Sequence, residues 1–450
     1  MFALLASIVN TIKCSQNGGL NSTNMKALTV IILFTLFAAV AQAQRICGSE
    51  AYKQQLLQTN PSLQNSFDAV ELQIAKATKK FAARDTTLNE VINIPVVIHV
   101  IYKTAAQNIT DAQINSQLTA LNNDFANLNV DKSKRPTVFS GLAADVRIKF
   151  CLAQVDPQGK KTTGIVRKST TVDLFTADDA MKSSLRGGNN PWDSKKYLNI
   201  WVCALTGRSL GYATPPGSNA DIDGVVIAFD VFGTVGNLRA SFNKGRTATH
   251  EVGHWMGLKH LWGDTDCGDD GIDDTPRQKT YNFGIPTFPN VTTCSPNANG
   301  DMFMNYMDFS DDAAMNMFTN DQKKRMRALF ATGNIRNSFL SSFACDSNLA
   351  QAGPIPAVVV PVVVPVPVVK INQIKVYPNP VQNNLMIDNK NVSASNPQII
   401  QIFNTVGVKV YNGSLTKESS NINLSQLTAG IYIVKIGENS NQFTTKFIKQ

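Results

Sequence analysis

The sequence predicts an α+β fold for its central region and a small all-β domain at its C-terminal end. Residues 94–102 form a near-continuous apolar run, which is typical of a central strand buried on both faces. Predicted strands and helices alternate after this run as far as residue 256. Residues 371–450 instead hold short alternating segments separated by turn residues, a pattern that predicts strands.

Local patterns predict each element of the central region in turn. Thr110 begins a capping box, which predicts a helix that continues to Phe125. Runs rich in β-branched and aromatic residues predict three further strands. These strands are expected at residues 147–152, 197–204 and 224–229. Two helices are expected after them, at about 245–256 and near 321–330.

Three segments precede the central domain, which we place at residues 94–345. Residues 25–43 have the form of a signal peptide, with one lysine, a short apolar core and a small-x-small cleavage site. Residues 1–24 resemble neither a domain nor a targeting segment, so we expect Met25 to be the true start. Residues 44–93 contain an amphipathic helical pattern and exposed basic residues, and we expect them to be a propeptide.

Valine alternates with proline in the segment that joins the central and C-terminal domains. Prolines at this density oppose a helix and favour an extended spacer, so residues 346–370 are expected to be a linker. No other apolar run after the signal peptide reaches the length of a membrane span. We therefore expect no transmembrane segment in the mature protein.

The charge pattern argues against a nucleic-acid-binding protein. The formal net charge of the 450 residues is +9, but only 17% of residues are charged and no long basic run occurs. The densest basic cluster, at residues 323–327, has the pattern of the solvated face of a helix. No interleaving of aromatic and basic residues accompanies it, so no nucleic-acid partner is expected.

A metal-binding motif lies within the helix expected at 245–256. His250, Glu251, His254, Gly257 and His260 form the pattern H-E-x-x-H-x-x-G-x-x-H. The first two histidines are four residues apart, so they lie on one face of a helix. Gly257 can adopt positive φ and turn the chain so that His260 returns as a third ligand. Three imidazoles and one open position describe a catalytic zinc site, because a structural site is closed by a fourth side chain.

The residue after the first histidine has the position of a general base. Zinc lowers the pKa of a bound water towards neutrality, and Glu251 is placed to take a proton from that water as it attacks a peptide carbonyl. This predicts a zinc-dependent endopeptidase. The alternative is a surface binding module with a degenerate zinc site, which the intact Glu251 and histidines disfavour.

Longer motifs resemble the metzincin zinc endopeptidases and, within them, the bacterial secreted branch of the pappalysin family. The metzincin clan has a methionine turn after the third histidine, for which Met307 is the candidate. The resemblance covers about residues 94–343. The further matching segments are 95–100, 198–203, 245–247, 273–276 and 300–307. This resemblance implies a zincin domain with a mixed sheet and a long zinc-binding helix, protein or peptide substrates, and synthesis as a latent zymogen.

The C-terminal domain closely resembles the sorting domain of the type IX secretion system of Bacteroidetes. Residues 376–380, 402–407, 427–432 and 446–449 carry this resemblance. It implies that the type IX secretion machinery is a partner, and that the protein crosses both membranes of a Gram-negative bacterium to be secreted or held at the cell surface. A carbohydrate-binding or adhesive module is the alternative.

Six cysteines follow the signal peptide, and export makes disulfides possible. Cys267 and Cys294 bracket the loop between the zinc helix and the methionine turn, and we expect them to pair. Cys151 and Cys203 fit either buried thiols or a bridge. Relatives usually carry a second bridge in the loop, but Ile285 and Ala314 occupy the two corresponding positions here.

Cys47 lies just after the expected signal cleavage site. A thiolate could fill the open position on zinc, and pappalysin zymogens are similar here, so we interpret Cys47 as a cysteine switch that keeps the precursor latent. The rival interpretation is a structural disulfide, with Cys345 as a candidate partner.

The loop after the zinc motif is crowded with aspartates, which repel one another unless a cation is present. Hard oxygen ligands suit calcium, and the resemblance also implies calcium here. The expected ligands are Asp264, Asp273, Asp274 and Thr275. The alternative is a solvated acidic loop.

The sequence departs from the family two residues after the turn methionine. Many relatives have a tyrosine at this position, whose hydroxyl can help to stabilise the transition state. This chain has Phe309, which lacks a donor. We expect an active enzyme that is slower than its tyrosine-bearing relatives.

Overall fold

The structure is a computed structural model that describes residues 45–82, 90–291, 293–294, 297, 299–342, 345–346, 374–390, 392–393, 397–404, 409–437 and 443–450. The predicted upstream segment and signal peptide lie outside the described residues, as does the predicted linker apart from Asp346. The chain divides into two compact units, residues 1–355 and 356–450.

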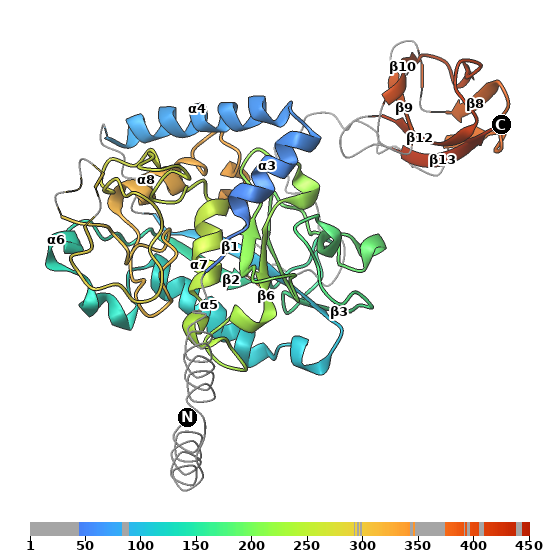
Figure 1. The fold of residues 1–450 in the computed structure, drawn as a ribbon. Helices are drawn as coiled ribbons and strands as arrows, with labels where there is room; N and C mark the ends of the chain where they lie inside the picture. The colour runs from blue at the N-terminus through green and yellow to red at the C-terminus, as the bar shows by residue number, and fades with distance from the viewer. Residues whose placement is uncertain are drawn as a thin grey trace, which may run out of the picture. The chain divides into compact units, whose positions relative to one another are not determined.

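Two helices make up the N-terminal segment, defined here as residues 45–82. They are α3 (Ser49–Thr59) and α4 (Leu63–Ala82). The apolar face of α4 is buried at Phe67, Val70 and Ile74, and this helix lies across α8 (Asn320–Ala328) (Figure 1). The apolar pattern of residues 63–77 predicts α4, whereas no pattern in the sequence predicts α3.

A mixed sheet runs through the first unit, as predicted. Its strands are β1 (Ile92–Tyr102), β2 (Ile148–Leu152), β3 (Ile165–Ser169), β4 (Leu198–Cys203), β5 (Gly211–Ala213) and β6 (Val225–Ala228). The order is β2-β1-β4-β6-β5, and β3 also pairs with β1. All described pairs are parallel except β5 with β6, and β5 is an edge strand. β3 and β5 escaped the sequence analysis because one is largely exposed and the other has three residues.

Two helices cover the sheet on the side of the metal motif. α5 (Asp111–Phe125) begins where Thr110 Oγ1 accepts a hydrogen bond from Gln113 N, and it packs on β2 and on α7 (Arg246–Trp255). α7 also contacts β5 and β6. The short helix α6 is Thr137–Ser140. The 3-10 turns are Ala105–Gln107, Val130–Lys134, Ala180–Lys182, Ser184–Arg186, Ala220–Ile222, Phe229–Val231, Ala240–Phe242 and Asn337–Ser341.

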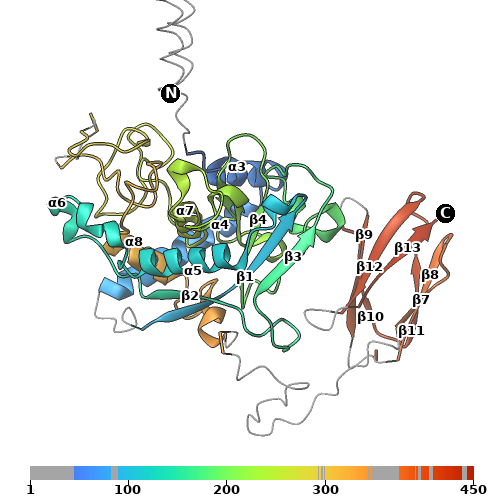
Figure 2. The same cartoon turned by 90° about the horizontal axis from the view of Figure 1, so that it is seen from below.

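The second unit contains only strands among its described residues, as predicted. They are β7 (Ile374–Tyr377), β8 (Asn384–Asn389), β9 (Gln398–Asn404), β10 (Lys409–Leu415), β11 (Ser419–Asn423), β12 (Gly430–Ile436) and β13 (Phe443–Lys449). One sheet has the order β10-β9-β12-β13 and the other β11-β8-β7 (Figure 2). Their apolar side chains form a core of their own, which includes Leu385, Ile402 and Phe447.

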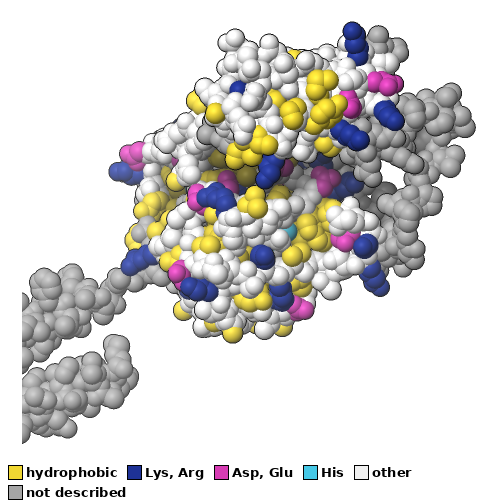
Figure 3. Space-filling view, turned by 90° about the vertical axis from the view of Figure 1, so that its right-hand side faces the viewer, with side chains coloured by type: hydrophobic (Ala, Val, Ile, Leu, Met, Phe, Trp, Pro, Cys, Tyr) yellow, Lys and Arg dark blue, Asp and Glu magenta, His cyan; other side chains and the backbone are white. Residues whose placement is uncertain are grey.

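Two surface properties bear on possible partners. Of the described helices, none has the length and hydropathy needed to cross a membrane. On the face shown in Figure 3, lysine and arginine side chains are scattered singly and do not gather into a continuous basic patch.

Candidate active site

The helix α7 and the turn that follows it bring three imidazoles together. His254 Nε2 lies 3.0 Å from the Nε2 atoms of both His250 and His260. Gly257 has φ of +82°, and its N–H bonds to the carbonyl of His254, so the chain leaves the helix in a tight turn. The side chain of His260 then points back at the other two histidines.

The outer nitrogen of each imidazole is bonded to a fixed acceptor. Nδ1 of His250 lies 2.6 Å from Tyr306 O, and Nδ1 of His254 lies 2.8 Å from Leu258 O. Nδ1 of His260 lies 2.5 Å from Asp264 Oδ1. Because these acceptors require Nδ1 to carry the proton, the Nε2 lone pairs face one another. Burial lowers the pKa of His254 to about 3, which keeps its ring neutral.

This arrangement fits a zinc ion. Three lone pairs that converge at 3.0 Å repel one another unless a cation lies between them, and imidazole nitrogen is a preferred zinc ligand. Cys47 Sγ belongs to the same cluster, in which all the ligand atoms lie within 4.8 Å of one another. The donor set is therefore three imidazoles from one short segment and one thiol from the N-terminal segment.

Glu251 lies beside this cluster and is buried, with 1% of its surface exposed. Burial raises the pKa of its carboxyl group to about 7. Its Oε2 accepts a hydrogen bond from Ser49 Oγ at 2.8 Å and one from Cys47 Sγ at 3.5 Å. The N-terminal segment therefore covers both the metal cluster and the carboxylate next to it.

Met307 packs against the metal-binding helix. It is fully buried, and a Cβ on Gly253 would lie 2.6 Å from Met307 Sδ. Only a glycine at position 253 therefore lets the methionine approach the helix so closely. The sequence predicts Met307 as the turn methionine, whereas the need for glycine at position 253 follows only from this contact.

Asp124 is a residue of this region that the sequence analysis missed. One carboxylate oxygen accepts from Thr249 Oγ1 and the other from Tyr306 OH, both at 2.8 Å. Thr249 precedes His250, and Tyr306 supplies the carbonyl that orients the same histidine. Asp124 on α5 thus ties the zinc helix to the methionine turn. No local pattern marks it, because its partners are more than a hundred residues away.

Arg45 fills a buried pocket near the metal cluster. Its guanidinium forms an ion pair with Asp312, donates to Ser310 O at 3.2 Å and lies 5.0 Å from the centre of the Phe242 ring. It also donates to Thr247 Oγ1, on α7, at 3.3 Å. The side chains of the ion pair are 1% and 0% exposed, so the pocket matches one cation with one carboxylate.

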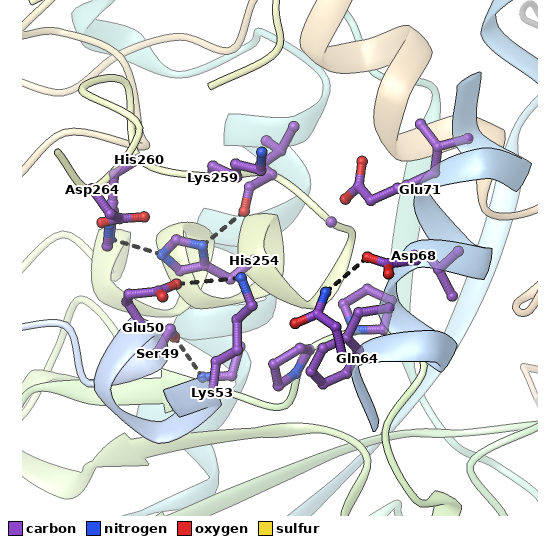
Figure 4. A pocket seen from close by; sticks show the side chains of 18 residues that line it. Ser49, Glu50, Lys53, Gln64, Asp68, Glu71, His254, Lys259, His260 and Asp264 are labelled. Atoms are coloured by element: carbon purple, nitrogen blue, oxygen red, sulfur yellow. Dashed lines mark hydrogen bonds and ion pairs between the residues drawn. The ribbon is translucent and has the colours of Figure 1, made fainter. Parts of the chain in front are cut away.

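Between Arg45 and Ser49, the N-terminal segment pairs with the edge strand β5. Gly48 N donates to Gly211 O at 2.9 Å, and Leu210 N donates to Ile46 O at 3.1 Å. Ser49 Oγ accepts from Ala213 N at 2.8 Å as well as donating to Glu251. A pocket of about 290 Å³ remains, where Ser49 and other residues of α3 face His254 (Figure 4).

The disulfides decide between the sequence interpretations of the cysteines. Cys267 and Cys294 are bonded to each other, as expected, and Cys151 is bonded to Cys345. The rival hypothesis of a Cys47–Cys345 bridge is therefore wrong, because Cys151 at the end of β2 is the partner of Cys345. Cys47 and Cys203 are free thiols, so the option of a buried thiol holds for Cys203 alone.

The segments around Ile285 and Ala314, where the family resemblance implies a second disulfide, are joined by a hydrogen bond instead. Ile285 is 66% exposed and Ala314 is buried. A backbone hydrogen bond of 2.8 Å from Asp311 N to Gly284 O joins the chain beside them. The two segments are therefore neighbours without the second disulfide.

The aspartates of the loop after the motif do not share one environment. Asp264 orients His260, which the sequence analysis did not foresee, and Asp273 is exposed. Asp274 accepts from Asp321 N at 3.0 Å. Asp270, which was not among the expected calcium ligands, is buried, and burial raises its pKa to about 7. Thr275 Oγ1 lies 3.0 Å from each carboxylate oxygen of Asp270.

Phe309 lies against the metal-binding rings. The centre of its ring is 4.8 Å from that of His260 and 5.8 Å from that of His250. Trp262 stacks on the same His260 with ring centres 4.5 Å apart, and Tyr281 packs on Phe309 at 5.2 Å. The side chain at position 309 is thus in contact with two candidate ligands.

Comparisons with known proteins agree with this geometry. The family model described as pregnancy-associated plasma protein-A matches residues 184–331, and that of the secretion system C-terminal sorting domain matches residues 375–450. An extracellular metalloprotease of Podospora anserina is 31% identical over 316 residues, which cover 66% of this chain and 93% of the relative.

Two solved structures are also similar. Mature mirolysin of Tannerella forsythia, in complex with a cleaved peptide, is 46% identical with a TM-score of 0.56, over 58% of this chain and 99% of that one. A promirolysin mutant of the same organism is 43% identical with a TM-score of 0.62, over 68% of this chain and all of that one. These likenesses confirm the predicted fold class, enzyme class and secretion, and they disfavour a degenerate binding module. The chain belongs to the pappalysin family of zinc metalloendopeptidases, and it is a secreted member made as a zymogen with a type IX sorting domain at its C-terminus.

Proposed function

We propose that His250, His254 and His260 hold the zinc ion and that Glu251 is the general base of peptide hydrolysis. The observation that carries this proposal is the convergence of three Nε2 atoms whose Nδ1 atoms are all bonded elsewhere. Bound zinc would polarise the peptide carbonyl and make a water more acidic.

The protein's own groups would carry the rest of the reaction. The Glu251 carboxylate would take a proton from the attacking water and give it to the nitrogen of the leaving amine. Asp264 and the carbonyl of Tyr306 would hold the imidazoles in orientation, which is the role of such hydrogen-bonded partners in metal sites. Met307 would pack beneath the histidines without binding the metal.

Metal removal tests this assignment directly. The mature enzyme should lose hydrolysis of casein on chelation and regain it when one zinc ion per chain is restored. Activity that survives complete zinc removal would contradict the proposal.

The N-terminal segment is proposed to be the inhibitory part of a propeptide comprising residues 44–93. Promirolysin covers 68% of this chain and mature mirolysin covers 58%, so the precursor form accounts for an additional part of the sequence. Cys47 would block the metal, and Ser49 would occupy the Glu251 carboxylate at the same time. Cleavage between α4 and β1 would release both contacts and leave a catalytic domain that begins before β1, and therefore before the boundary at residue 94 that the sequence predicts.

The pocket that holds Arg45 is proposed to receive a basic side chain of the substrate next to the cleaved bond. A buried carboxylate that has lost its ion-pair partner is costly, so Asp312 favours a new cation once Arg45 leaves. Arginine also has the planar shape that Ser310 O and Thr247 Oγ1 recognise here.

Calcium is proposed to bind in the loop after the zinc motif. Support comes from the buried Asp270 carboxylate, the Thr275 hydroxyl beside it and the Ile272 carbonyl, which lies 3.0 Å from that hydroxyl. These are hard oxygen donors. Asp273 and Asp274 lie in the same loop and could complete the site. Calcium titration of the zinc-loaded enzyme, followed by thermal unfolding, should show a rise in the midpoint.

The C-terminal unit is proposed to bind the type IX secretion machinery through residues 371–450, joined to the catalytic domain by the linker at 346–370. Deletion of this domain should stop passage across the outer membrane without changing hydrolysis by the purified catalytic domain. Normal secretion of the truncated chain would contradict this assignment.

A further inference from the structure

Tyr52 of α3 fills a polar pocket beside the active-site cleft. The residue is 1% exposed, and its ring lies on that of Tyr212 with centres 4.6 Å apart. Its hydroxyl donates to the carboxylate of Asp179 and lies 2.7 Å from each oxygen. This pocket takes no part in the proposed catalysis or in the contacts of Arg45, Cys47 and Ser49.

A buried lysine forms the floor of the pocket. The Lys182 ammonium is paired with Asp179 at 2.9 Å and donates to Thr214 Oγ1 and to Ile222 O, each at 2.8 Å. It lies 5.1 Å from the centre of the Tyr212 ring. It also donates to the Tyr52 hydroxyl at 3.4 Å. Because its other partners belong to the catalytic domain, the charge pair and the aromatic wall should remain when Tyr52 leaves.

Backbone contacts fix the loop that carries Asp179 and Lys182. Asp179 has φ of +62° and Gly187 has φ of +86°. A Cβ on Gly188 would lie 2.2 Å from Met181 O, so the two ends of this loop are in direct contact. These backbone contacts lie within the catalytic domain and do not involve Tyr52.

The pocket lies across the edge strand from Glu251. Trp201, Val226 and Tyr212 are paired across β4, β6 and β5, so their side chains lie on one face of the sheet. Gly211 lies on the other face, where its Cβ would be 3.2 Å from Glu251 Cγ. The N-terminal segment crosses this edge, with Ser49 on the side of Glu251 and Tyr52 on the side of Tyr212.

A peptide that pairs with β5 points its side chains alternately to these two faces. The N-terminal segment already pairs with this strand at Gly48 and Gly211. On the side of the zinc helix, Arg45 fills the pocket of Asp312. On the other side, a Cβ on Gly48 would lie 3.4 Å from Tyr212 Cβ, and Tyr52 enters the pocket of Asp179 and Tyr212 from the first turn of α3.

We propose that this second pocket becomes a substrate subsite for a tyrosine side chain once the N-terminal segment is removed. The inference rests on the proposed function, because it requires that segment to be a propeptide. A tyrosine hydroxyl would donate to Asp179 as Tyr52 does, whereas phenylalanine would leave the carboxylate without this partner. Hydrogen bonds to charged groups contribute about 1.5–3 kcal/mol, which corresponds to a preference for tyrosine of about 10- to 100-fold.

A peptide series tests this subsite with the zinc-loaded mature enzyme. Each peptide keeps one arginine beside the cleaved bond and carries tyrosine, phenylalanine or O-methyltyrosine at successive positions on either side. At one position, kcat/KM should be about 10- to 100-fold higher for tyrosine than for phenylalanine. O-methyltyrosine cannot donate, so it should be cleaved no faster than phenylalanine, and this measurement needs no variant enzyme.

The substitution Asp179→Asn identifies the pocket responsible. It should bring the ratio of the tyrosine and phenylalanine rates towards one, whereas Asp173→Asn, at a carboxylate that is 80% exposed, should keep the ratio. A tyrosine preference that persists in Asp179→Asn, or equal rates for all three residues at every position, would overturn the subsite. Failure to cleave any peptide of the series, by an enzyme that hydrolyses casein, would instead contradict the basic subsite of the proposed function.

Discussion

The two halves of the active site are encoded in different ways. The metal-binding half comes from one short segment, residues 250–260, in which helical spacing and one glycine bring the ligands together. The half that meets residues 45–52 of the N-terminal segment is assembled from residues 179–182, 211–214 and 310–312. The first half can be identified from a motif, whereas the second exists only after the chain has folded. In the function proposed above, the reaction belongs to the local segment and selection of the substrate belongs to the assembled one.

The largest expected effect is on kcat when Glu251 is removed, because this change should stop catalysis and leave metal binding intact. Glu251→Ala should lower kcat by about 10⁴-fold or more, because general bases contribute about 10²- to 10⁴-fold and this one acts on both the water and the leaving group. Zinc content should stay at one per chain, since all three histidines remain. Turnover close to that of the wild type in a zinc-loaded variant would remove Glu251 from the mechanism.

A second prediction asks which contact of the assembled half maintains latency. Cys47→Ser should give a full-length precursor that hydrolyses peptides before processing, because a hydroxyl is a poor replacement for a thiolate at zinc. Ser49→Ala should cause a smaller gain, of about 10-fold, since it removes one hydrogen bond to the Glu251 carboxylate and one from Ala213 N but leaves Cys47 in place. If the precursor stays equally inactive with serine at position 47, the contacts of Arg45, Ser49 and Tyr52 are enough for latency.

The third prediction tests whether the assembled half selects the substrate. Asp312→Asn should lower kcat/KM by about 10- to 100-fold for peptides with arginine beside the cleaved bond, because the buried charge pair is lost. Peptides with a neutral residue at that position should change little. Asp311→Asn, the same change at the adjacent carboxylate, serves as the control. An unchanged preference for arginine in Asp312→Asn would place the basic subsite elsewhere.

The smallest expected effect lies at the border of the two halves. Phe309→Tyr should raise kcat by about 10-fold or less with little change in KM, because a hydroxyl would act mainly in the transition state and the metal already carries most of the charge stabilisation. Phe283→Tyr, at a phenylalanine that is 58% exposed, should change neither constant. No rise in kcat with fold and zinc content intact would mean that another group already performs this role.

The sequence was sufficient for the long elements and insufficient for the short ones. The apolar run of β1 and the capping box of α5 predicted their positions to within two residues at each end. The three-residue strand β5 could not be recognised, because its pairing with β6 and not its composition makes it a strand. The same strand forms the edge of the cleft, so the sequence analysis lacked the element on which the N-terminal segment lies.

The cysteines and aspartates show the same limit. The spacing of Cys267 and Cys294 around one loop was enough to expect their bond, whereas the bond between Cys151 and Cys345 joins residues 194 apart. The density of aspartates after the motif indicated a cation site, but it did not distinguish Asp264, which orients His260, from the buried Asp270. The composition shows only that carboxylates are present, whereas the burial and the hydrogen-bond partners of each carboxylate decide its role.

The sequence by itself contained the zinc motif and predicted its general base, the order of the domains and the secreted zymogen form, of which the comparisons confirm the last. These depend on spacing along the chain, where helix periodicity and a glycine turn act over a few residues. Only the tertiary structure decided that Asp124 joins α7 to the methionine turn, that Arg45 lies on Asp312 and that Tyr52 lies on Asp179. Such contacts join groups that are distant in the sequence, and each is made by burial that withdraws both partners from water, so no local pattern records them.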